Sequence, residues 1–253
     1  MLNPELPWHE VVLDFNLFIV ALSTGFIVAS GFIINAFYDL ERDVINKPQE
    51  VVINRLLSQQ TGLNFYFLFN TIGMILSFYV SKKVMLFNFL FSIALWFYSH
   101  KLKKLGFLGN ISAVLLTVAP FLVIVVYYRD INPAIFFYVA FIAVVQLTRE
   151  IVKDVLAQKG DVIYGYNSVP LNFGITQSKR LIYTLVILSP LPPAALYIIY
   201  DFNRVAYYFI AALSALVLVS VLTYKARNKA DFSRINNILK GVIAAGILSI
   251  ALV

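Results

Sequence analysis

Two short stretches of the sequence carry the side chains best suited to bind a divalent metal ion. The first places an amide and two carboxylates at intervals of four residues: Asn35, Asp39 and Asp43. On a helix this spacing brings the three side chains to one face, where their oxygens can converge on one cation. The second stretch forms a comparable stripe: Glu150, Asp154 and Asp161. Two such stripes facing one another would suit Mg²⁺, which is usually bound by carboxylates, water and substrate phosphate oxygens.

The composition indicates an integral membrane protein and excludes several classes of enzyme. The 253 residues are 60% hydrophobic and 13% charged, and the mean hydropathy is +0.82. The absence of cysteine excludes disulfides and thiolate metal sites, and two histidines are too few for a zinc cluster. The net charge of +7 comes from residues in short loops between apolar segments, so we expect no nucleic-acid partner.

Hydropathy predicts an all-α protein, in which a polytopic bundle of about eight transmembrane helices forms one domain over residues 1–253. A spanning helix needs ~20 mostly apolar residues. The predicted spans are, approximately, residues 11–38, 61–80, 84–99, 107–128, 132–156, 179–200, 203–224 and 234–253.

The distribution of basic residues predicts the orientation of this bundle. Fifteen of the 20 lysines and arginines fall in the loops that follow the first, third, fifth and seventh spans. By the positive-inside rule, these loops face the cytoplasm of a cell inner or plasma membrane and both termini face outward. Both acidic stretches then lie on the cytoplasmic side. We therefore expect a cavity there, between the helices that carry Asp39 and Asp154.

Basic side chains in the predicted cytoplasmic loops would surround the acidic stripes: Lys47, Arg55, Lys101, Lys104, Arg149 and Lys153. A metal ion and several cations at the mouth of an apolar bundle would suit a lipid diphosphate. The charged head group would be neutralised, and the tail would lie among the helices.

These patterns resemble the UbiA superfamily of intramembrane prenyltransferases, whose first motif reads Asn-Asp-x-x-Asp-x-x-x-Asp and whose second is a spaced pair of aspartates. Asn35, Asp39 and Asp43 match the first motif in register, and residues 45–48 are similar to its continuation. Residues 149–154 with Gly160 and Asp161 resemble the branch that contains digeranylgeranylglyceryl phosphate synthase. Weaker matches include residues 98–110 and 168–174, so the resemblance runs from about residue 25 to 180.

The resemblance implies that an isoprenoid chain, of geranylgeranyl type, is transferred from a prenyl diphosphate to a lipid acceptor such as geranylgeranylglyceryl phosphate. It implies Mg²⁺ as cofactor, held by Asn35, Asp39 and Asp161 with help from Asp43 and Asp154. The four aspartates would be the catalytic residues. Lys101, Lys104 and Arg149, together with Lys47 and Lys153, would bind the diphosphate. Aromatic faces such as those of Phe37, Tyr38, Tyr98 or Tyr164 could stabilise an allylic cation.

The sequence departs from the family pattern at three points. Ala36 stands where the first motif usually has aspartate, and Ala157 stands four residues before Asp161, where another is expected. The family usually has nine helices, and here the motif helix is already the first, so either the start is truncated or the bundle is naturally one of eight.

Three other functions stay open. The acceptor could be an aromatic quinone precursor or water. The two alanines would also suit a member that binds isoprenoid lipid without catalysis. An ion-coupled transporter fits less well, because its acidic residues would be spread through the depth of the bilayer. We expect no obligate protein partner.

Overall fold

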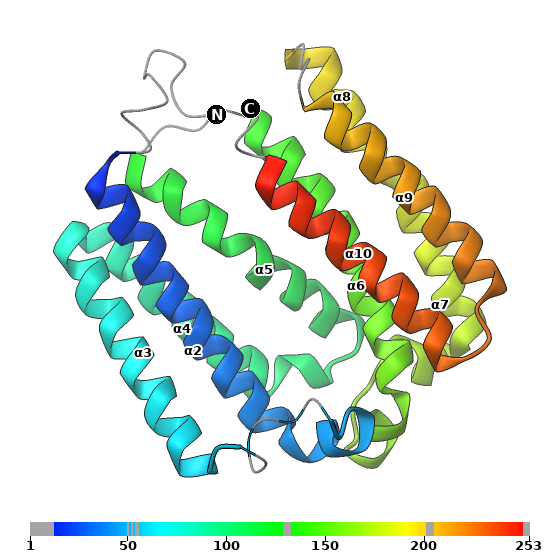
Figure 1. Ribbon diagram of the computed structural model, residues 1–253, viewed down its shortest axis with the longest axis horizontal. Coiled ribbons are helices and arrows are strands. Elements are labelled where there is room, and N and C mark those ends of the chain that lie inside the picture. Colours follow the sequence, from blue (N-terminus) through cyan, green and yellow to red (C-terminus); the bar gives the residue numbers. More distant parts are fainter. Residues whose placement is uncertain are drawn as a thin grey trace. The chain divides into compact units, whose positions relative to one another are not determined.

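The computed structural model describes residues 13–49, 51, 53, 56–128, 133–200 and 205–249. These residues are almost entirely helical (Figure 1), which confirms the predicted all-α membrane bundle. The chain divides between residues 131 and 132 into two compact units. Six segments are long and apolar enough to cross a bilayer: Phe15–Asn46, Gln59–Val80, Phe107–Tyr128, Ala134–Ile163, Val169–Tyr200 and Ala206–Lys225. The count of eight spanning helices stays a prediction.

The N-terminal unit is built around one long helix, which carries the first acidic stretch. Its elements are α2 (Phe15–Asn46), α3 (Gln59–Val80), α4 (Lys82–His100), the short 3₁₀ helix η1 (Leu102–Lys104) and α5 (Phe107–Tyr128). The Asp14 side chain caps the start of α2 by accepting from the backbone N–H groups of Asn16 and Leu17. The structure continues α2 to Asn46, eight residues beyond the predicted end at 38. Low hydropathy marks the end of an apolar segment but does not end a helix.

Small side chains let the helices of this unit approach closely. A Cβ added at Gly73 of α3 would lie 2.7 Å from the Ile27 side chain and 3.0 Å from the carbonyl oxygen of Ser23. Helices in lipid gain little from the hydrophobic effect between them, so close packing and interhelical hydrogen bonds hold them together. Gly73 therefore allows α3 to pack directly against the backbone of α2.

Two layers of buried polar side chains then join α2, α3 and α4. In the first, the Asn88 amide on α4 donates to the Ser77 hydroxyl at 2.8 Å and accepts from the Thr24 hydroxyl at 3.3 Å. In the second, the Asn70 amide on α3 donates to Ser92 at 2.8 Å and to Ser30 at 3.2 Å. Each asparagine side chain thus contacts two other helices, which fixes the position of α2.

The C-terminal unit packs its helices around α6. The elements are α6 (Ala134–Ile163), α7 (Val169–Leu188), α8 (Leu191–Tyr200), α9 (Ala206–Lys225) and α10 (Lys229–Ser249), drawn from green to red in Figure 1. The core contains fully buried side chains from α6, α7, α9 and α10, among them Phe141, Ile182, Leu216 and Ile235. Asn228 and Asp231 form a reciprocal cap at the start of α10, in which each side chain accepts a backbone N–H.

The predicted sixth span, residues 179–200, is wrong at its start and in its continuity. The helical segment begins ten residues earlier, at Val169, and its backbone breaks at Gly174, where φ is 80°. A second interruption between α7 and α8 coincides with Pro190, which cannot donate a backbone hydrogen bond. Polar residues before residue 179 lower the mean hydropathy there, so the sequence did not predict the first part of the helix.

We predict that Asn88→Ala lowers the free energy of unfolding by about 1–3 kcal/mol, because it removes the amide shared by three helices and leaves a cavity. The measurement is thermal unfolding of the purified chain in detergent micelles. Asn64→Ala is the matched control, since Asn64 is exposed on α3. Equal loss in both variants would show that the Asn88 layer adds nothing specific.

Candidate functional site

The first acidic stretch lies at the C-terminal end of α2, inside the helix. Asn35 and Asp39 are one turn apart, and Asp43 follows one turn later at the start of the last turn. Asp39 is buried, whereas Asp43 is partly exposed. The C-terminal end of a helix carries partial negative charge, which disfavours carboxylates and favours cations. A cation beside these side chains is therefore expected on physical grounds.

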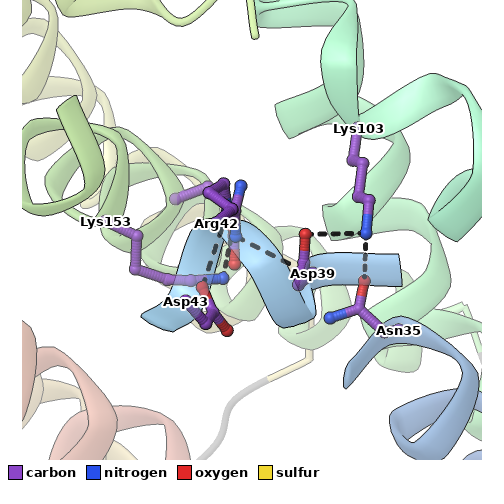
Figure 2. A network of polar contacts seen from close by, with 7 residues as sticks. Asn35, Asp39, Arg42, Asp43, Lys103 and Lys153 are labelled. Atoms are coloured by element: carbon purple, nitrogen blue, oxygen red, sulfur yellow. Dashed lines mark hydrogen bonds and ion pairs between the residues drawn. The ribbon is translucent and has the colours of Figure 1, made fainter. Parts of the chain in front are cut away.

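That cation is Lys103, which approaches from the 3₁₀ helix η1 (Figure 2). Its ammonium lies 2.8 Å from Asp39 Oδ1 and donates to Asn35 Oδ1 at 3.4 Å. Side-chain exposure is only 5% for Lys103 and 4% for Asp39, so the ion pair is screened little by solvent. Burial lowers the pKa of the Lys103 ammonium, and the Asp39 charge and hydrogen bond oppose this effect.

Two glycines place Lys103 at this position. Gly106 has a φ of 63°, in the left-handed region that favours glycine, and it turns the chain from η1 into α5. Gly109, in the first turn of α5, packs against the backbone of η1. A Cβ added there would lie 2.9 Å from the Leu102 carbonyl oxygen and 3.1 Å from that of Lys103. The sequence after α4 thus brings η1 and α5 together, and Lys103 points at Asp39.

Arg42 is a second cation within the same cluster. Its guanidinium lies 3.4 Å from Asp39 Oδ2 and 3.5 Å from Asp43 Oδ1, so it bridges the two carboxylates of the first motif (Figure 2). Both motif carboxylates therefore have cationic neighbours that belong to the protein itself.

Tyr38 adds an aromatic face beside these charges. The Lys103 ammonium lies 5.8 Å from the centre of its ring, a cation–π distance. Tyr38 also lines a half-open cavity of about 360 Å³ among α2, α3 and α4. The other lining residues are Ile34, Phe37, Leu63, Tyr66, Phe67, Ser92, Ile93 and Trp96. The ring separates an apolar space from the charged cluster, and it is one of the four aromatic residues that the sequence suggested.

The second acidic stretch lies in the C-terminal half of α6. Glu150 is buried and accepts hydrogen bonds from Gln146 Nε2 at 2.8 Å and from Lys153 Nζ at 2.7 Å. Arg149 Nη1 lies 3.9 Å from the same carboxylate. Lys153 and Arg149, both predicted to bind diphosphate, are thus counter-ions of Glu150 in this structure. Glu150 is thus paired with an amide and two cations of its own helix.

Asp154 and Asp161 occupy the last turns of α6, with Asp154 partly buried and Asp161 buried. The helix ends because Gly165 adopts a φ of 67° and the Tyr166 N–H donates to the Asp161 carbonyl oxygen. Asp161, like Asp43, therefore lies at the negative end of a helix. Among the residues that the structure describes, no three acidic or histidine side chains gather closely enough to hold a metal ion by themselves.

The remaining predicted site residues are exposed at helix ends: Lys47 after α2, Lys101 after α4 and Lys104 in η1. Arg55 lies outside the residues that the structure describes. Arg42, Lys103 and Gln146 were not predicted from the sequence to be site residues. The position of Arg42, three residues after Asp39 and one before Asp43, was a usable signal. No local spacing pointed to Lys103, because its partner lies 64 residues away.

Comparisons with known proteins identify the family of this chain. The profile of the UbiA prenyltransferase family matches residues 6–238, which span both compact units. A digeranylgeranylglyceryl phosphate synthase from Methanobrevibacter smithii is 25% identical over 241 residues, which cover 90% of this chain and 83% of the relative.

Two solved structures share the fold. The apo structure of a UbiA homolog from Aeropyrum pernix K1 aligns with a TM-score of 0.75 at 15% identity, over 94% of this chain and 90% of that one. A UbiA homolog from Archaeoglobus fulgidus, bound to GPP and Mg²⁺, aligns with a TM-score of 0.66 at 18% identity, over 93% and 88%. The chain belongs to the UbiA prenyltransferase family.

Proposed function

We propose that this chain is a Mg²⁺-dependent prenyltransferase, which moves a geranylgeranyl-type chain from its diphosphate to a lipid acceptor such as geranylgeranylglyceryl phosphate. The observation that carries the proposal is the convergence of Asn35 Oδ1 and Asp39 Oδ1 on one ammonium group at the end of the motif helix. The name of the relative from Methanobrevibacter smithii supports this acceptor.

The residues of the first motif suit a magnesium ion. Two oxygens from neighbouring turns already point at one positive charge, and the Lys103 ammonium stands in for a metal cation there. An amide and a carboxylate oxygen are ligands that Mg²⁺ accepts, and it completes its shell with water and substrate phosphate. Asn35, Asp39 and Asp43 would hold the ion, as would Asp154 and Asp161 of the second motif. Bound there, Mg²⁺ supplies positive charge to the oxygens of the departing diphosphate.

The cations of the chain would bind and orient the diphosphate. Lys103 is more buried than Arg42, Arg149 or Lys153, and its flexible stem allows the ammonium to move from carboxylate to phosphate. Lys47, Lys101, Lys104, Arg149 and Lys153 are the candidates that the sequence offered. The Tyr38 ring, which already faces an ammonium group, would stabilise the allylic cation that forms when the diphosphate leaves.

The orientation follows from charge. We propose that the two units form one domain in a cell membrane, with the motif ends of α2 and α6 on the cytoplasmic side and both termini outside. The support is the excess of lysine and arginine on that side. Within the N-terminal unit, the contact of Lys103 with Asp39 joins the basic segment after α4 to the acidic end of α2.

The test is incubation of the purified chain with labelled geranylgeranyl diphosphate and Mg²⁺, together with geranylgeranylglyceryl phosphate, an aromatic quinone precursor or water alone. We expect label in the glycerol lipid, and no transfer when EDTA removes the metal. Transfer to the aromatic compound would favour the quinone alternative. Saturable binding of the diphosphate without transfer to any acceptor would favour a non-catalytic member of the family.

We predict that Asp39→Asn lowers Mg²⁺-dependent transfer at least about a hundredfold, because it removes a charged ligand from the site of electrostatic stabilisation. Asparagine keeps the size and one acceptor for Lys103, which limits the loss of stability that a smaller side chain would cause. Glu41→Gln is the matched control, an exposed carboxylate on the same helix. Full activity in Asp39→Asn would contradict the metal assignment.

We predict that Gly109→Ala lowers transfer as well, although Gly109 carries no reactive group. The added methyl would collide with the backbone of η1 and displace Lys103 from Asp39. Gly25→Ala is the control, since a Cβ there meets nothing within 4 Å. The measurements are the rate of transfer and the thermal unfolding temperature. Unchanged transfer in a folded Gly109→Ala protein would show that the position of Lys103 is unimportant.

We predict that Ala157→Asp reduces the Mg²⁺ concentration needed for half-maximal binding of the diphosphate. The new carboxylate lies one turn before Asp161 on the same face of α6, and an added oxygen ligand strengthens a site for a hard cation. Ala157→Asn separates the effect of charge from that of size. Unchanged or weaker metal dependence in Ala157→Asp would remove Asp161 from the proposed ligand set.

A further inference from the structure

The Lys103 ammonium occupies the oxygens that the proposed metal ion would need. It lies 2.8 Å from Asp39 Oδ1 and 3.4 Å from Asn35 Oδ1. A Mg²⁺ ion that bound both of these oxygens would lie about 2.0–2.1 Å from each, close to the place that the ammonium group takes beside them. A metal ion that uses both atoms on this side therefore competes with Lys103.

The charges of the cluster make this displacement unfavourable for a metal ion alone. Two carboxylates, Asp39 and Asp43, face two cations, Arg42 and Lys103. Each of the two carboxylates thus already has a cationic neighbour, so a bare dication would enter beside two positive groups and would leave the Lys103 ammonium buried without the Asp39 carboxylate. Separating a buried ion pair in this way is unfavourable.

A diphosphate makes the displacement of the Lys103 ammonium favourable. Its negative oxygens offer the displaced ammonium new acceptors, and charge-assisted hydrogen bonds to phosphate are among the stronger ones in proteins. The lysine stem has four carbons and can swing without movement of η1. Arg42, whose guanidinium bridges Asp39 and Asp43, would remain to hold the two motif carboxylates together.

We infer that Lys103 is an internal cation that competes with Mg²⁺ for Asn35 and Asp39, so that metal ion and diphosphate bind cooperatively. This inference rests on the proposed function, because it takes the first motif as a metal site for a diphosphate substrate. Each ligand raises the affinity for the other by the same factor, as thermodynamic linkage requires. The site thus resists loading with metal alone and gains its ion together with the substrate.

The test is titration of the purified chain in detergent micelles with Mn²⁺, which stands in for Mg²⁺ and whose unbound form gives a measurable paramagnetic resonance signal. Wild type, Lys103→Met and Lys103→Gln are compared in the absence of diphosphate. Methionine keeps the length of the side chain, and glutamine keeps a hydrogen-bond donor, but neither is charged. Lys82→Met is the control, because Lys82 is an exposed lysine at the start of α4 and is not among the candidate site residues.

Both Lys103 variants are expected to bind Mn²⁺ at least about tenfold more tightly than wild type, which corresponds to about 1.4 kcal/mol. Lys82→Met is expected to change the affinity by less than about twofold, as for an exposed charge. The titration is then repeated with inorganic pyrophosphate, corrected by a protein-free titration for metal bound in solution. Pyrophosphate should tighten Mn²⁺ binding in wild type and do so less in Lys103→Met.

The inference is overturned if the Lys103 variants bind Mn²⁺ no more tightly than wild type, or if Lys82→Met gains as much as they do. Because the titration contains no prenyl chain and no acceptor, its result is independent of the transfer assay. A chain that transfers normally but shows unchanged Mn²⁺ affinity in both Lys103 variants refutes the competition alone. A chain that transfers nothing but shows tighter Mn²⁺ binding in both refutes the proposed activity alone.

Discussion

Burial of the Asp39 carboxylate in the C-terminal part of a membrane helix is the constraint on which the rest of this site depends. A charged group removed from water is costly unless an opposite charge and hydrogen bonds accompany it. Lys103 provides that charge across 64 residues of sequence, and Arg42 adds a second from the same helix. Gly109 packs closely against η1, the element that carries Lys103. The local geometry of α4, η1 and α5 is thus organised around one carboxylate of α2.

Precise placement of α2 requires more than apolar contact, because lipid chains compete equally well for apolar side chains. The interhelical hydrogen bonds of the two asparagine layers provide this placement. Asn88 and Asn70 each bind hydroxyl groups on two neighbouring helices, and a sideways shift of α2 would break these bonds in an environment without water. The same helix therefore carries both the structural polar layers, in its first half, and the acidic motif, near its end.

The buried carboxylate of Glu150 in the second acidic stretch is also neutralised, but by residues of its own helix. Glu150 is paired by Lys153 and Gln146 from its own helix, so its neutralisation needs no contact between distant segments. Asp161 lies at the end of α6, where the left-handed Gly165 stops the helix. Both motifs thus place carboxylates at helix ends, which is where a cation is most strongly attracted.

The sequence by itself determined the class of fold, the family and the shared face of Asn35, Asp39 and Asp43, because hydropathy and helical periodicity are local properties. The family and the helical bundle are confirmed. Hydropathy misplaced the end of α2 and the start of α7, since hydrogen bonding, not apolar character, ends a helix. Only the tertiary structure decided that Lys103, rather than its neighbours Lys101 and Lys104, faces Asp39. All three lysines carry the same charge, and the direction of each side chain is set by the 3₁₀ turn and by the packing of Gly109 against it.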